Sequence, residues 1–155
     1  MDMPWPWSPI EVHQHIDASR DDVFNAISNP TTYPEWLVGT QRIRHVDGEF
    51  PKPGTKFDHS VGPTENITAD DDTKAMEVQG HRRLLLEVHI GPFHGEVEFT
   101  LNKRGDNSTE VRMRECPIGP FAVITPVMRP ILAARNRASL HKLAQLLERS
   151  HAAQP

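Results

Sequence analysis

The middle of the chain alternates apolar and polar residues with a period of two, and this pattern continues for about seventy-five residues. Short turns containing Gly, Pro, Asp and Asn divide it, among them Asp47-Gly48 and Gly91-Pro92. Connections this short join antiparallel neighbours, because parallel strands need a crossover of about a dozen residues or more. The sequence therefore predicts an antiparallel meander with strands at 41–47, 55–61, 66–79, 83–91, 94–103 and 109–116.

An acidic run, Asp70-Asp71-Asp72, interrupts the third of these predicted strands. Runs of like charge are usually solvated, so the first interpretation is a solvated bulge or loop. A calcium site is the alternative, because Ca²⁺ prefers carboxylate oxygens.

The first part of the chain predicts one strand and two short helices. Residues 10–18 alternate as a strand does, and Ser19 follows as an N-cap residue. Acidic residues in the next turn suit the dipole of a short helix that Asn29-Pro30 ends. Residues 31–36 predict a second brief helix, which ends before Gly39.

The C-terminal part of the chain, from Thr125 to Arg149, predicts a long amphipathic helix. At about 1.5 Å per residue it is roughly 36 Å long, enough to cross a small domain. Two polar residues, Asn136 and Ser139, interrupt its apolar stripe. Buried polar groups need partners, so the sheet, a ligand or water has to supply them. These two residues are the first indication of a cavity. The apolar stripe consists of Met128, Leu132, Leu140, Leu143, Leu146 and Leu147.

Together these elements predict an α+β fold, in which a curved antiparallel sheet of about seven strands surrounds the C-terminal helix. One such helix covers the concave face without filling it, so a ligand site is expected between helix and sheet. Residues 10–150 are expected to form this single domain. Residues 1–9 are expected to be an extended N-terminal segment that lays Trp5 and Trp7 on the body of the domain.

Charge and composition exclude several classes of function. The net charge of −4 and the pI near 6.1 argue against nucleic acid as a partner, which needs a basic face. No apolar run approaches the ~20 residues that span a bilayer, so no stable membrane insertion is expected. The N-terminus lacks the features of a signal peptide, and the single Cys116 is compatible with a reducing compartment. The sequence thus predicts a cytoplasmic location, with a homodimer left open.

Four stretches resemble a known family. They are residues 16–30, IDASRDDVFNAISNP; Tyr33-Pro34-Glu35-Trp36; Gly119-Pro120 before the last helix; and residues 135–143, RNRASLHKL. They are similar to the START-like (SRPBCC) superfamily, and more narrowly to its polyketide cyclase/dehydrase and lipid-transport group, over residues 10–149. The resemblance implies the helix-grip fold. Its members bind lipids, hormones or polyketides, catalyse cyclisations, or act as co-chaperone-like or toxin-like interaction modules, so fold alone does not settle function.

The phase of each predicted strand indicates which side chains face the cavity. The inner set includes two titratable residues, His59 and Glu115, which are candidates for acid–base chemistry or for fixing a polar head group. The alternative is that both are solvated at the rim of the sheet. Arg135, at the edge of the helix stripe, can pair with Glu115. The full set of predicted ligand-binding residues is Trp36, Phe57, His59, Met76, Val88, Phe99, Met113, Glu115, Met128, Leu132, Arg135, Asn136 and Ser139.

The leading hypothesis is non-covalent binding of a small lipid-like or polyketide-like molecule, with the interaction module as the rival. A third hypothesis is an aromatase/cyclase-like enzyme. In it His59 is the base, Glu115 orients the imidazole or serves as the acid, and Asn136 donates a hydrogen bond to a developing enolate oxygen. No cofactor is expected.

The nine histidines suggest a metal, but the sequence does not predict one. His13, His15, His89 and His94 fall on the outer face, without Cys or carboxylate residues at a recognisable ligand spacing. The same phase predicts outer cross-strand pairs between Arg112 or Arg114 and the glutamates of the preceding strand. Cys116 is expected to be a small core residue, because nothing near it lowers its pKa.

Overall fold

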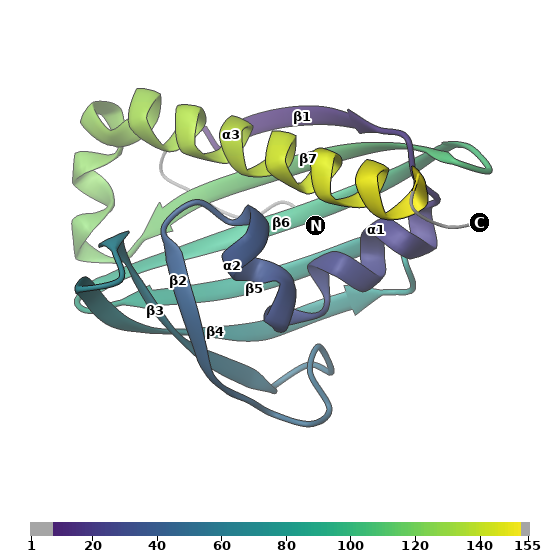
Figure 1. Ribbon diagram of the computed structural model, residues 1–155. Coiled ribbons are helices and arrows are strands. Elements are labelled where there is room, and N and C mark those ends of the chain that lie inside the picture. Colours follow the sequence, from purple (N-terminus) through teal and green to yellow (C-terminus); the bar gives the residue numbers. More distant parts are fainter. Residues whose placement is uncertain (1–7, 153–155) are drawn as a thin grey trace.

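The computed structural model describes residues 8–152, so the predicted packing of Trp5 and Trp7 lies outside the described part. A curved antiparallel sheet of seven strands surrounds a long C-terminal helix, as predicted (Figure 1). In chain order the elements are β1 (Ile10–Ile16), α1 (Arg20–Ile27), η1 (Pro30–Thr32), α2 (Tyr33–Trp36), β2 (Thr40–Val46), β3 (Lys56–Thr64), β4 (Ile67–Gln79), β5 (Arg83–Ile90), β6 (Phe93–Gly105), β7 (Ser108–Ile118), η2 (Pro120–Ile124) and α3 (Thr125–Ala152).

The strand order is β1-β7-β6-β5-β4-β3-β2, with every neighbouring pair antiparallel. Strands β2 to β7 thus form the predicted meander, and β1 adds to its far edge beside β7. The helices lie over one face of the sheet, and α3 contacts β1 and α2 (Figure 1). None of the helices within residues 8–152 is both long and apolar enough to span a bilayer.

The two short helices close one end of the sheet, and local hydrogen bonds hold them there. The Ser19 hydroxyl accepts a hydrogen bond from the Asp22 amide and so caps α1. The Tyr33 hydroxyl donates to the carbonyl of Ile27, and the Trp36 indole donates to Thr32 Oγ1 over 3.0 Å. Both aromatic rings are buried, so this corner of the domain is apolar.

The two halves of α3 pack differently against the sheet. Leu140, Leu143 and Ala144 in its C-terminal half are buried in the core. Met128 and Leu132 in its N-terminal half are only partly buried, and Val127 beside them is exposed. The C-terminal half therefore packs tightly on the sheet, while the N-terminal half leaves space beneath it.

The acidic run does not interrupt β4, so the predicted loop is wrong. The strand is continuous, and Asp70, Asp71 and Asp72 pair with β3 through their backbones. Strand alternation points the middle carboxylate inward, and Asp71 is only 3% exposed. The two outer carboxylates find cationic or imidazole partners, Asp70 at Arg44 and Asp72 at His89.

The irregularity of β4 lies further along, where the register shifts between Ala75 and Glu77. An extra residue at this point changes which side chains face the cavity. Ala75 is buried, whereas Met76 is 37% exposed and lines a hollow of the outer face together with Glu77, Arg83 and Glu98. The prediction that Met76 lines the cavity is therefore wrong, because it assumed strict alternation through a bulge.

Candidate functional site

Two adjoining cavities lie between α3 and the sheet. The outer one, of about 320 Å³, lies between the N-terminal half of α3 and the hairpin that joins β5 to β6, and the inner one, of about 50 Å³, reaches toward α2 and β3. The outer cavity is lined by Val88, Ile90, Phe93, His94, Gly95, Glu115, Pro117, Ile124, Met128, Leu132 and Arg135. The inner cavity is lined by Tyr33, Trp36, Leu37, His59, Asp71, Thr73, Leu86, Val88, Ile90, Val97, Phe99, Met113, Glu115 and Arg135.

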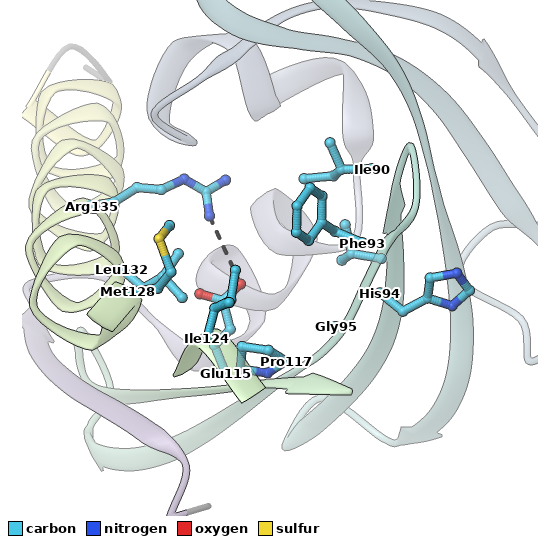
Figure 2. A pocket seen from close by; sticks show the side chains of 11 residues that line it. Ile90, Phe93, His94, Gly95, Glu115, Pro117, Ile124, Met128, Leu132 and Arg135 are labelled. Carbon is cyan, nitrogen blue, oxygen red and sulfur yellow. Dashed lines mark ion pairs between the residues drawn. The ribbon is translucent and has the colours of Figure 1, made fainter. Parts of the chain in front are cut away.

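The mouth of the outer cavity is apolar. Figure 2 shows Met128 and Leu132 on α3 across the opening from Ile90 and Phe93. Phe93 is 43% exposed, so its ring stands at the boundary with solvent. An apolar ligand could enter between these side chains and remove both surfaces from water.

A polar group of three residues crosses the space between α3 and β7, where the two cavities meet. Arg135 Nη1 lies 3.9 Å from Glu115 Oε2, which confirms the predicted pair (Figure 2). Asn136 Nδ2 donates a hydrogen bond of 2.8 Å to Glu115 Oε1. Two consecutive residues of α3, Arg135 and Asn136, thus contact the Glu115 carboxylate.

The polar residues within the stripe of α3 have partners in the protein. Ser139 Oγ accepts a hydrogen bond of 3.0 Å from the Val38 amide and donates to the Arg135 carbonyl. Arg135 Nε donates to the Val38 carbonyl over 2.9 Å. Ser139 is therefore an anchor for the segment after α2, whereas Asn136 Oδ1 has no hydrogen-bond partner within the described residues.

A second polar group, from β3 and β4, lies in the wall of the inner cavity. His59 Nε2 lies 3.3 Å from Asp71 Oδ2 and 3.1 Å from Thr73 Oγ1, and all three side chains are buried. His59 and Asp71 are directly opposite in the β3–β4 register. The two side chains therefore meet because of strand pairing, although they are twelve positions apart along the chain.

Burial shifts the pKa values of this pair in opposite directions. Burial, helped by the neighbouring Asp72 carboxylate, raises the pKa of Asp71 to about 8. Burial, helped by the positive charges of Arg135 and Arg44, lowers the pKa of His59 to about 4. At neutral pH the pair is therefore a carboxylic acid beside a neutral imidazole.

This pair also has unused hydrogen-bonding capacity. Within the described part of the chain, His59 Nδ1 and both carboxyl oxygens of Asp71 lack a hydrogen-bond partner. Buried polar atoms without partners are rare and are usually satisfied by water or a ligand. The inner cavity is thus a place where a polar group of a bound molecule gains hydrogen bonds.

Most of the predicted ligand-binding residues line one or both cavities: Trp36, His59, Val88, Phe99, Met113, Glu115, Met128, Leu132 and Arg135. Phe57 is instead a buried core residue whose ring packs against His59, with centroids 5.0 Å apart. Asn136 and Ser139 act on the site through the hydrogen bonds described above, and Met76 lies outside it.

Asp71 is the main site residue that the sequence prediction missed. A signal was present, because a continuous strand over residues 66–79 paired with 55–61 brings an acidic residue opposite His59. The acidic run obscured it by indicating a loop. Cys116, in contrast, is buried as predicted, and burial raises the pKa of its thiol to about 11, so it is a poor nucleophile.

Comparison with known proteins gives one family and a set of similar folds. The model of the family described as polyketide cyclase/dehydrase and lipid transport matches residues 9–148. Comparison with curated proteins gives no significant match.

Three solved structures illustrate the likeness of fold. Protein CV1439 from Chromobacterium violaceum is 14% identical, with a TM-score of 0.74 over 92% of this chain and 99% of that one. The di-domain aromatase/cyclase BexL of the BE-7585A biosynthetic pathway is 12% identical, with a TM-score of 0.72 over 92% of this chain and 47% of that one. A norcoclaurine synthase from Thalictrum, bound to a transition-state analogue, is 16% identical, with a TM-score of 0.65 over 97% and 99% of the two chains. Identities this low show the fold alone.

Proposed function

This chain belongs to the polyketide cyclase/dehydrase and lipid transport family, and we propose that it binds a small hydrophobic molecule bearing carbonyl or hydroxyl groups between the sheet and α3. The observation that supports this proposal is the contrast between the apolar mouth of the site and its polar inner wall. An apolar mouth leads to an inner wall where buried polar atoms lack partners among residues 8–152.

The volume of the outer cavity fits such a ligand. Small-molecule pockets occupy about 300–1,000 Å³, are mostly apolar, and place a few polar groups that fix orientation. Here the apolar wall is Met128, Leu132 and Phe93, and the polar groups are the Glu115–Arg135 pair and the His59–Asp71 pair. A hydrocarbon chain without polar atoms would leave the second pair unsatisfied, so a polyketide-like or oxygenated lipid-like ligand fits better.

Filling the mouth of the outer cavity should weaken ligand binding. With 1-anilinonaphthalene-8-sulfonate as a fluorescent probe, Leu132→Trp is expected to weaken binding at least about 10-fold, because the indole occupies space between α3 and Phe93. Ile67→Trp is the matched control, since Ile67 is 64% exposed and lies outside both cavities. Fluorescence titration of the three proteins measures the effect.

Two outcomes would count against a binding site in this cavity. One is equal affinity of the probe for wild type and Leu132→Trp. The other is native mass spectrometry, on protein purified from its own host, that shows an empty chain in a stable complex with another protein. The second outcome would support an interaction module. A co-purifying oxygenated hydrophobic molecule would support the proposed binding function.

A second candidate function, acid–base catalysis, is favoured by the His59–Asp71 pair. With Asp71 protonated and His59 neutral at pH 7, one side of the cavity holds both a proton to donate and a lone pair to accept one. Proton transfer on a poly-carbonyl substrate needs both. The Glu115–Arg135 pair, which shares this cavity, would then orient the substrate or stabilise a developing enolate oxygen.

Turnover of a poly-β-carbonyl substrate separates catalysis from binding. His59→Ala and Asp71→Asn are each expected to lower kcat by about 10²-fold or more, as is typical for the loss of a positioned acid or base. Glu115→Gln should mainly raise KM if Glu115 orients the substrate. Ile67→Trp serves again as the control with unchanged activity. Equal turnover by wild type, His59→Ala and Asp71→Asn would leave a binding protein without catalysis.

A further inference from the structure

We propose that Glu87, His89 and His94 form a binding site for a divalent transition-metal ion of the zinc class, on the outer face of the sheet. The outer-face positions of His89 and His94 were predicted from sequence, but a metal was not. The structure brings them together with a carboxylate, so that one ligand atom of each of the three residues lies within 4.8 Å of the others.

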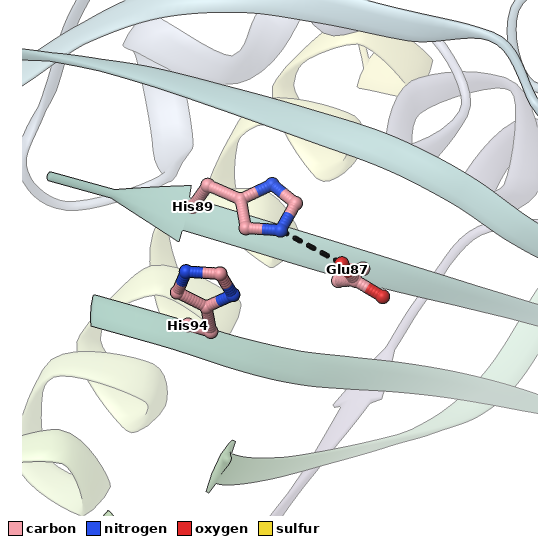
Figure 3. A group of neighbouring side chains, drawn as sticks. All are labelled: Glu87, His89 and His94. Atoms are coloured by element: carbon pink, nitrogen blue, oxygen red, sulfur yellow. Dashed lines mark ion pairs between the residues drawn. The ribbon is translucent and has the colours of Figure 1, made fainter. Parts of the chain in front are cut away.

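The three side chains share a face because of strand geometry. Glu87 and His89 are two residues apart on β5, and His94 on β6 is directly opposite His89 in the register. Figure 3 shows the three side chains together over the two neighbouring strands. The imidazole rings meet edge to face with centroids 4.4 Å apart, and His89 Nε2 lies 2.7 Å from Glu87 Oε1.

These spacings are close to those of a metal site. Zinc bonds of about 2.0–2.1 Å to nitrogen and oxygen place two tetrahedral ligand atoms about 3.3 Å apart. The observed separations, from 2.7 Å to at most 4.8 Å, bracket that value. An ion would therefore replace the direct contact between His89 and Glu87 with small side-chain rotations and no movement of the backbone.

A fourth residue, Asp72, orients the His89 imidazole for metal binding. Asp72 Oδ1, on the neighbouring strand β4, lies 2.8 Å from His89 Nδ1. A carboxylate that accepts the Nδ1 proton fixes the tautomer and leaves the Nε2 lone pair for a metal, and this arrangement recurs behind metal-bound histidines. The other ring nitrogen of His89, Nε2, is the atom that lies 2.7 Å from Glu87 Oε1.

His94 distinguishes this cluster from an ordinary ion pair. Its imidazole contacts the ring of His89, and within residues 8–152 no ion pair or side-chain hydrogen bond holds its nitrogens, so they can bind an ion. His15 offers a useful contrast, because it lies near two carboxylates, Asp17 and Glu110, but within residues 8–152 it does not belong to such a group of three ligand residues. Two imidazoles and one carboxylate form a ligand set that suits zinc-class ions.

The position of the site indicates a structural role. Val88, Ile90 and Gly95, on the same two strands, line the outer cavity from the opposite face of the sheet. His94 also lines this cavity, but its imidazole points away from it (Figure 2), so an ion held by Glu87, His89 and His94 would join β5 and β6 on the outer face at the cavity mouth. The proposal is thus independent of the ligand-binding function proposed above.

Calorimetric titration with zinc chloride, on protein without a histidine tag, tests the site. Wild type is expected to bind one ion with a Kd below about 100 μM. His94→Ala, an exposed position where folding is not at risk, should weaken binding at least about 100-fold, and Asp72→Asn about 10- to 100-fold. His15→Ala is the matched control and should bind as wild type does.

A second measurement avoids dependence on affinity alone. Cobalt(II) should give visible d–d absorption typical of four-coordination with wild type and not with His94→Ala. Zinc should raise the Tm of wild type, because it binds only the folded state, and leave that of His94→Ala unchanged. Absence of one-to-one binding below about 100 μM, or equal losses in His94→Ala and His15→Ala, would overturn the proposal.

Discussion

Phe57→Ala is expected to lower the free energy of unfolding by about 3–5 kcal/mol, which is typical for the loss of a fully buried aromatic ring. Phe57 is 0% exposed. Its ring centroid lies 5.2 Å from that of Tyr33, 5.1 Å from that of Phe50 and 5.0 Å from that of His59. The substitution therefore opens a cavity between the corner that holds α2 and the strand that positions His59.

Phe93→Ala makes the same chemical change at the mouth of the outer cavity, where the ring is 43% exposed. The surrounding water already contacts much of this ring, so a loss below about 1 kcal/mol is expected. Urea denaturation of wild type and the two variants measures both values. Similar losses in the two variants would show that Phe57 does not support the site as a packed core residue.

Much of the fold could be predicted from the sequence because its signals are local and repeated. Each short turn after a period-two segment makes the next strand antiparallel, so the order of β2 to β7 follows from local information, whereas the place of β1 beside β7 depends on a long-range pairing. Ser19 likewise marks the beginning of α1 through a hydrogen bond to a residue three positions away. Such patterns depend on neighbours in the chain, which the sequence displays directly.

The site was less predictable because it depends on register. A single bulge after Ala75 moves Met76 from the cavity to the outer face. Asp71 was missed for the related reason that its role depends on the residue opposite, His59 on β3, and not on its acidic neighbours. Residues predicted from regular strands, such as Val88 and Phe99, are found in the cavity wall.

The three residues of the acidic run of β4 lie in three different environments. Asp70 lies on the surface near Arg44, Asp71 lies in the cavity wall beside His59, and Asp72 holds His89 on the outer face. Strand alternation separates the middle carboxylate from the other two. Burial then makes Asp71 the member of the run whose pKa is raised, to about 8.

Above neutral pH, the free energy of unfolding of the wild type is expected to fall as pH rises. Asp71→Asn should not show this fall. Raising a carboxyl pKa from 3.8 to about 8 corresponds to about 6 kcal/mol of preference for the neutral form in the folded state. The stability associated with the proton on Asp71 is complete below pH 3.8 and is lost as pH rises through about 8. Between pH 7 and pH 9, wild type should therefore lose about 1–2 kcal/mol relative to Asp71→Asn.

The titration of His59 does not contribute to the change in stability between pH 7 and pH 9. Its pKa is lowered from 6.5 to about 4, so the stability associated with neutral His59 is complete above pH 6.5 and is lost as pH falls through about 4. Below pH 6.5 the two residues therefore act in opposite directions, whereas above pH 7 Asp71 acts alone within the pair. Urea denaturation of both proteins at pH 7, 8 and 9 gives the difference, and the other titrating groups cancel because both proteins contain them. Parallel pH profiles for wild type and Asp71→Asn would mean that Asp71 is already ionised at pH 7, and the neutral acid needed for proton donation would be absent.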